Sequence, residues 1–173
     1  MRWWAWVLGG LAAVVVMDQN KRFLVEGLAR ARTMIEGFEG FSAKPYKDQA
    51  GHWTIGYGHL LRAGEPVTAS ITKDRAQQLL EQDMSTATAV VDSAVTVPLT
   101  AGQRAALISF AFNVGSENFQ ASTLLRLLNA GDYVAAADQF PRWDKYTDPV
   151  TGRLVVDAGL LRRRQDERKV FVA

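Results

Sequence analysis

The stretch from Glu36 to His59, EGFEGFSAKPYKDQAGHWTIGYGH, constrains the fold more than any other part of the chain. Upstream of it, apolar residues recur at helical spacing and predict a helix over about residues 23–38. Gly37 and Gly40 weaken that helix and predict its end beside Glu39. The residues after Gly40 have the composition of a hairpin, so we expect a helix end to face two short strands.

The expected hairpin has a short strand at Tyr46–Asp48, a turn at residues 49–51 and a return strand at His52–Tyr57. Asp48 and Thr54 are six positions apart. On one regular strand, an even separation would place both side chains on the same face, and the turn makes this only approximate. The hairpin therefore predicts a carboxylate and a hydroxyl presented together.

Two carboxylates in different local settings, Glu39 and Asp48, can separate into an acid and a base. Two such carboxyl groups are the minimum set of catalytic groups for cleaving a glycosidic bond. The alternative is that both are ordinary solvated surface charges, which is what most surface carboxylates are. Glu36 is a local rival for the role of the acid, but it lies one helical turn before Glu39.

The pattern Glu-x8-Asp-x5-Thr followed by TIGYGH resembles the phage-type lysozymes, glycoside hydrolase family 24. The resemblance continues over about residues 30–171 and includes the motifs ITKD (71–74), EQD (81–83), LISFAFNVG (107–115), STLL (122–125) and LRRR (161–164). It implies an α+β, mostly helical fold, with a small β-hairpin lobe, a helical lobe and a cleft between them.

The resemblance also implies a reaction, cleavage of the β-1,4 bond between N-acetylmuramic acid and N-acetylglucosamine in peptidoglycan. By the same resemblance Glu39 is the general acid, Asp48 stays ionised and acts on a water, and Thr54 positions that water. Direct activation of water inverts the anomeric configuration, and the two carboxyl groups are then roughly 6.5–9.5 Å apart. The resemblance implies neither a metal nor an organic cofactor.

Five further residues receive roles near the cleft. Asn113 resembles a cleft position of the family, and Tyr57 and Gly58 are expected to contact substrate, Gly58 because a missing side chain lets a large ligand approach the backbone. A lone histidine is more often structural than catalytic. The resemblance implies that His59 pairs with Asp83 and stabilises the fold.

Arg162, Arg163 and Arg164 form a basic run that would ordinarily be a solvated face. The family resemblance implies that one of the three reaches the cleft carboxylates and steadies their charge. The sequence does not say which one.

The amino-terminal run Trp3–Met17, WWAWVLGGLAAVVVM, is apolar and uncharged. As a helix it would be about 22 Å long, which is short against a hydrocarbon core of roughly 30 Å. Gly9 and Gly10 add little apolar area. We therefore divide the chain into a hydrophobic segment at residues 1–20 and a catalytic domain at residues 21–173.

Three interpretations of that segment compete, beside a buried core helix. A cleaved signal peptide would need a small-x-small site, which is not evident after Met17. A permanent anchor would be marginal at this length. The segment is most similar to that of the signal-arrest-release (SAR) endolysins, in which an uncleaved anchor exports the enzyme, tethers it to the inner membrane and later leaves it. The expected location is the periplasmic face of the host inner membrane, then the periplasm.

The flanking charges conflict with export. Positive residues are more numerous after the segment, at Lys21, Arg22, Arg30 and Arg32, than before it. The positive-inside tendency alone would keep the domain in the cytoplasm, whereas long domains translocate largely regardless of charge. Because the expected substrate lies outside, we expect export.

Composition limits the remaining function classes. The chain has 173 residues, 48% of them hydrophobic, a net charge of +2 and a pI near 9.0. This supports one domain and suits an anionic cell wall, but the excess charge is too small to indicate nucleic acid. The absence of cysteine excludes activation by disulfide exchange. We expect a monomer.

The rest of the chain predicts helices: from a Thr72 cap to about Ser93, from Thr100 to Val114, after a Ser122 cap, over residues 132–140 and over residues 160–171. Residues 144–157 predict a loop or small hairpin.

Two other functions are weighed, a lytic transglycosylase and a catalytically silent wall-binding or lysis-regulating protein. A transglycosylase would not need a water held by Asp48 and Thr54, and the masses of the products separate it from a hydrolase. The intact Glu39, Asp48 and Thr54 argue against a catalytically silent protein.

Overall fold

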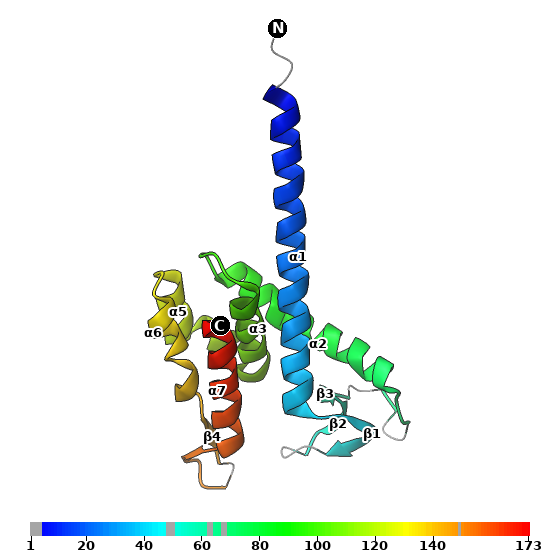
Figure 1. The fold of residues 1–173 in the computed structure, drawn as a ribbon. Helices are drawn as coiled ribbons and strands as arrows, with labels where there is room; N and C mark the ends of the chain where they lie inside the picture. The colour runs from blue at the N-terminus through cyan, green and yellow to red at the C-terminus, as the bar shows by residue number, and fades with distance from the viewer. Residues whose placement is uncertain (1–4, 48–50, 62–63, 67–68, 149) are drawn as a thin grey trace.

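The computed structural model describes residues 5–47, 51–61, 64–66, 69–148 and 150–173, with side chains from Lys21 onward. Figure 1 shows a helical body with a small sheet at one end and a long first helix, α1, that extends out of the body. The fold is α+β and mostly helical, as the sequence predicts.

Helix α1 runs without interruption from Ala5 to Glu39. It ends where the sequence predicts but begins far earlier, so the segment boundary expected at residue 20 falls inside one helix. Its lower half packs mainly on α3 (Ala101–Val114). Gly27 permits that contact, because a Cβ there would lie 3.3 Å from Ala101 O and from Arg104 Cβ. In Figure 1 the N-terminal half of α1 stands clear of the body.

Within the described residues, no helix combines the length and the apolar character needed to cross a membrane.

Three short antiparallel strands, β1 (Ser42–Lys47), β2 (Trp53–Gly56) and β3 (His59–Leu60), form the sheet in that order. Strand β1 begins earlier than predicted, and its pairing with β2 is irregular between Ser42 and Tyr46. Pro45 lies in that interval, and proline cannot donate to a strand ladder. Strand β3 was not predicted. It follows a tight turn that contains Gly58 at φ +83°, a backbone conformation that favours glycine.

The predicted caps of the helices are confirmed, because capping depends on residues close in sequence. Thr72 accepts from Arg75 N at the start of α2 (Lys73–Ala94), and Ser122 accepts from Leu125 N at the start of α5 (Thr123–Asn129). Thr100 and Gln103 form a capping box at α3. Gly115 ends α3 at φ +87°.

Other predictions need correction in extent. Helix α4 (Ser116–Gln120) was not predicted. The helix expected over residues 132–140 is only α6 (Tyr133–Ala137), followed by a 3-10 turn at Phe140–Arg142 that contains Pro141. The small hairpin expected within residues 144–157 is confirmed: it consists of β4 (Lys145–Thr147) and β5 (Leu154–Val156) and leads into α7 (Ala158–Val172).

Helix α3 is the centre of the hydrophobic core and packs against α1, α2 and α7 (Figure 1). Residues Ala105 to Phe110 are fully buried, as an apolar helix of this kind predicts. Phe110 meets the rings of Phe140 and Trp143 edge-on at centroid distances of 5.3 and 5.4 Å. Gly102 allows α7 to approach closely, since a Cβ there would lie 2.7 Å from Val170 O.

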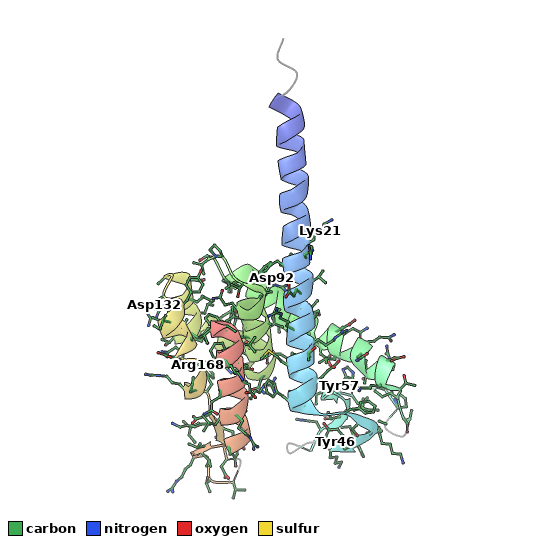
Figure 2. The ribbon with its side chains drawn as sticks, in the orientation of Figure 1. Lys21, Tyr46, Tyr57, Asp92, Asp132 and Arg168 are labelled. Atoms are coloured by element: carbon green, nitrogen blue, oxygen red, sulfur yellow. The ribbon has the colours of Figure 1, made fainter. Side chains whose placement is uncertain are left out.

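A buried arginine that was not predicted from the sequence joins three helices. Arg104 of α3, 4% exposed, donates to both carboxylate oxygens of Asp92 in α2 at 2.9 and 2.8 Å. Its Nη1 also donates to Leu24 O in α1 at 3.0 Å. Asp92 lies beside α1 at the end of the body away from the sheet (Figure 2). The interaction fixes α1 to the body just below the point where it emerges.

The contact expected between His59 and Asp83 is present and joins the sheet to α2. His59 Nδ1 lies 2.8 Å from Asp83 Oδ2, and the histidine is 6% exposed. On its other side, His59 Nε2 lies 3.6 Å from Glu65 Oε2. Because each ring nitrogen faces a carboxylate oxygen, the ring is fixed in orientation between β3 and α2.

If His59 is structural, Asp83→Ala lowers the free energy of unfolding by about 1–3 kcal/mol, the cost of leaving a buried donor without its acceptor. The turnover number of the folded variant stays within two-fold of wild type. Asp138→Ala is the control, because it removes an exposed ion pair with Arg168 at 2.7 Å, and its expected cost is below about 1 kcal/mol. Chemical denaturation and a wall-lysis assay measure both effects. A folded Asp83→Ala protein without activity would contradict the structural role.

Candidate active site

Glu39 is the last residue of α1, and the chain turns away from the helix at Gly40, which has φ +69°. The glutamate side chain is 27% exposed. Its Oε2 lies 3.5 Å from the position that a Cβ of Gly58 would occupy. The helix end therefore faces the turn between β2 and β3, which contains Gly58.

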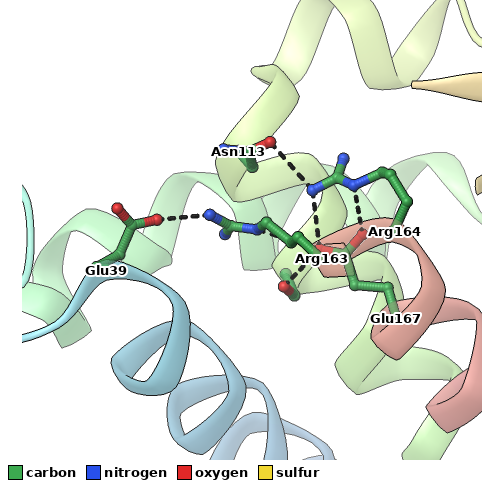
Figure 3. A network of polar contacts seen from close by, with 6 residues as sticks. Glu39, Asn113, Arg163, Arg164 and Glu167 are labelled. Atoms are coloured by element: carbon green, nitrogen blue, oxygen red, sulfur yellow. Dashed lines mark hydrogen bonds and ion pairs between the residues drawn. The ribbon is translucent and has the colours of Figure 1, made fainter. Parts of the chain in front are cut away.

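Arg163 is the arginine of the basic run that reaches this carboxylate. Its Nη1 donates to Glu39 Oε1 at 2.6 Å (Figure 3), and its guanidinium lies 4.8 Å from the centre of the Phe38 ring. Arg162 is exposed and Arg164 is fully buried. The geometry thus resolves the choice that the sequence left open among the three.

Behind Arg163 lies a buried polar network, shown in Figure 3. Glu167 Oε1 accepts from Ser109 Oγ at 2.7 Å and from Arg164 Nη2 at 3.0 Å, and it lies 3.4 Å from Arg163 Nε. Arg164 Nε lies 3.0 Å from Glu167 Oε2, which completes an ion pair. Arg164 Nη2 also donates to Asn113 Oδ1 at 3.0 Å. One carboxylate inside the protein therefore contacts two guanidinium groups.

Burial sets the protonation behaviour of this network. It lowers the pKa of Arg164 to about 10, against the attraction of Glu167, so the guanidinium remains charged at neutral pH. Burial also raises the pKa of the Glu167 carboxyl, against the attraction of Arg164 and Arg163 and the hydrogen bond from Ser109. Glu167 and Ser109 were not predicted from the sequence. A usable signal was present, because Glu167 follows Arg163 by four positions on a helix and Ser109 interrupts an apolar helix.

The other predicted site residues lie in different settings. Thr54 in β2 is 3% exposed, and its Oγ1 donates to His52 O at 3.3 Å. Tyr57 is 4% exposed and packs on Phe41 with a centroid distance of 5.6 Å, beside the sheet (Figure 2). Asn113 is exposed at the end of α3. Asp48, the expected base, lies outside the described residues, and the catalytic and substrate-binding roles of all these residues stay predictions.

A surface cavity of about 390 Å³ lies beside Gly58 and is lined by Gly58, His59, Leu60, Leu61, Asp83 and Phe112. Gly58 belongs both to this cavity and to the surroundings of Glu39. The arrangement offers a partly exposed carboxyl group, held by a guanidinium, next to a space that a ligand can enter. Among the described residues, no cluster of histidine, cysteine, aspartate and glutamate side chains could hold a metal ion.

Comparisons with known proteins identify the family of the chain. The family model described as phage lysozyme matches residues 36–167. An endolysin of Acyrthosiphon pisum secondary endosymbiont phage 1 is 39% identical over 140 residues, which are 80% of this chain and 92% of the relative. A SAR-endolysin of Enterobacteria phage PA-2 is 37% identical over 137 residues, 78% of each protein.

Among solved structures, the endolysin from Escherichia coli O157:H7 phage FAHEc1 matches with a TM-score of 0.77 and 36% identity. The match covers 83% of this chain and 90% of that one. Together with the family model, which spans most of the chain including Glu39 and Arg163, these relatives decide the assignment. The chain therefore belongs to the phage lysozyme family and is a lysozyme-type glycosidase.

Proposed function

We propose that this protein is an endolysin that hydrolyses the β-1,4 bond between N-acetylmuramic acid and N-acetylglucosamine in peptidoglycan and so lyses a host cell. The observation that carries the proposal is the placement of Glu39 at a helix end, held by Arg163 and facing Gly58. The relatives named as endolysins support the assignment to this class of enzyme.

In the proposed reaction Glu39 is the general acid and protonates the glycosidic oxygen as it leaves. Asp48, as the general base, removes a proton from a water on the opposite face of the sugar. Thr54 positions that water through its hydroxyl. Asn113, Tyr57 and Gly58 are proposed to contact the glycan, with Gly58 contributing space and backbone.

Replacing the acid tests the proposal directly. Glu39→Gln is expected to lower the lysis rate by about 10²–10⁴-fold, the usual contribution of a general acid. Glu36→Gln is the matched control on the same helix, because Glu36 Oε1 accepts from Gln77 Nε2 of α2 at 3.2 Å and faces other partners. The control is expected to stay within a few-fold of wild type. Rates are measured on purified cell walls and on outer-membrane-permeabilised bacteria, and near-normal lysis by Glu39→Gln would refute the assignment.

The products distinguish the proposed hydrolysis from a lytic transglycosylase. Because water attacks opposite the leaving group, the new reducing end is expected to appear first as the α-anomer, and product masses should include one added water. Early-time proton NMR and mass spectrometry measure these quantities. Thr54→Val keeps the shape of the side chain without the hydroxyl and is expected to lower the rate. Anhydro-sugar ends, or a β-anomer formed first, would contradict the proposed mechanism.

We further propose that Trp3–Met17 exports the enzyme, tethers it at the periplasmic face of the host inner membrane and later leaves the bilayer. A relative named as a SAR-endolysin supports this location. From Ala5 onward the apolar segment forms the beginning of the helix that ends at Glu39, and the N-terminal half of that helix stands clear of the body (Figure 1). The tether would thus attach at the end of the molecule opposite the site.

Membrane release predicts a shift between cell fractions. After depolarisation of the membrane, wild-type protein is expected to move from the membrane fraction to the soluble fraction. A variant with Gly9→Leu and Gly10→Leu is expected to remain in the membrane, because two leucines add apolar area worth about 3–6 kcal/mol. Immunoblots of fractionated cells measure both. Wild-type protein that never becomes soluble would indicate a fixed anchor.

A further inference from the structure

Glu167 is a buried carboxylate that the proposed reaction does not use. It is 0% exposed and lies on α7, one helical turn after Arg163. It therefore cannot touch a substrate in the cleft. It does touch Arg163, the residue that holds Glu39.

The Arg163–Glu39 ion pair is complete only while Glu39 is a carboxylate. A general acid, however, must carry its proton when the glycosidic oxygen leaves. At that stage Glu39 is neutral, and the Arg163 charge loses the partner that lies 2.6 Å away. A buried charge without a partner is costly, so the guanidinium needs a second counter-charge to stay in place.

We propose that Glu167 is a positioning residue for Glu39: it keeps Arg163 fixed through the proton cycle of the acid by supplying a second counter-charge on the protein side. This inference rests on the proposed function, because it assumes that Glu39 gains and loses a proton during turnover. Glu167 acts through Arg163 and is not itself a catalytic residue.

The surroundings of Glu167 suit this role. Ser109 and Arg164 hold its Oε1 at 2.7 and 3.0 Å, and Arg164 in turn is held by Asn113 and lies 4.9 Å from the centre of the Phe110 ring. With Glu39 ionised, two carboxylates balance two guanidinium groups. With Glu39 neutral, Glu167 alone remains between the two cations, already in contact with both.

The first test uses Glu39→Gln as a neutral stand-in for the protonated acid in the full-length protein. The NMR signal of the Arg163 Nε–H group, assigned by its loss in Arg163→Lys, reports whether the guanidinium is held. We expect slow hydrogen exchange of that proton in wild type and within about three-fold of it in Glu39→Gln. Exchange that becomes more than ten-fold faster in Glu39→Gln would show that Glu39 alone holds Arg163 and would overturn the proposal.

The second test is kinetic and uses soluble peptidoglycan fragments. Glu167→Gln keeps the size of the side chain but removes its charge, and kcat is expected to fall about 10–100-fold, since small misplacements of a catalytic group have effects of this size. KM should change less than three-fold, because Glu167 does not contact substrate. Wild-type kcat in a folded Glu167→Gln protein would overturn the proposal.

Asp92→Asn is the control for a merely structural effect. It weakens another ion pair of a buried arginine, Arg104, at the end of the body away from the sheet. Both variants are assayed at the same interval below their own melting temperatures, and Asp92→Asn is expected to retain kcat within two-fold. Equal losses of kcat in the two variants would overturn the positioning role. If Glu167→Gln does not fold, the exchange measurement on Glu39→Gln decides the question.

Different experimental results would contradict the proposed function and the role of Glu167. Normal lysis by Glu39→Gln would end the proposed function whatever the exchange data show. Loss of lysis in Glu39→Gln together with rapid exchange of the Arg163 Nε–H group would leave the proposed function intact and remove only the role of Glu167.

Discussion

The contact between Arg163 and Glu39 joins two elements that are 124 residues apart, and the candidate site depends on it. Neither residue is positioned by the other alone. Helix α1 brings Glu39 and helix α7 brings Arg163, and both helices pack on α3. The distance between a guanidinium and a carboxylate is thus a consequence of how two helices lie against a third.

That packing depends on places where a side chain is absent. Gly27 lets α1 approach α3, and Gly102 lets α7 approach it from another side. A Cβ at Gly102 would fall 2.7 Å from the carbonyl oxygen of Val170, which is backbone and cannot simply rotate away. A shift of α7 to relieve that overlap would also move Arg163, because helices are stiff on this scale. The packing of the core therefore determines the geometry of the site in this protein.

The sequence predicted what is encoded locally. Caps such as Thr72 and Ser122, and the end of a helix at Glu39, follow from residues within one or two turns of each other. The choice among three consecutive arginines could not be predicted in this way, because it depends on the rotation of α7 about its axis. The pairing of Glu167 with Ser109 crosses 58 positions and depends on the same packing. Family resemblance supplied the expected role of Glu39, and the placement of Arg163 came only from the structure.

Helix α1 belongs to both the proposed tether and the site. Its attachment to the body therefore determines whether a movement of the tether reaches the site. The helix has 35 residues and is about 52 Å long. Arg104 binds the carbonyl of Leu24, and Gly27 sits against α3, so α1 is fixed to the body near its midpoint. Below that point, Glu39 is held by its hydrogen bond with Arg163. Motion of the first twenty residues is therefore resisted at the contact with α3 before it reaches the carboxylate. If the segment is a releasable anchor, release needs to change only the reach of the enzyme toward the cell wall, because the geometry at Glu39 is fixed by the body itself.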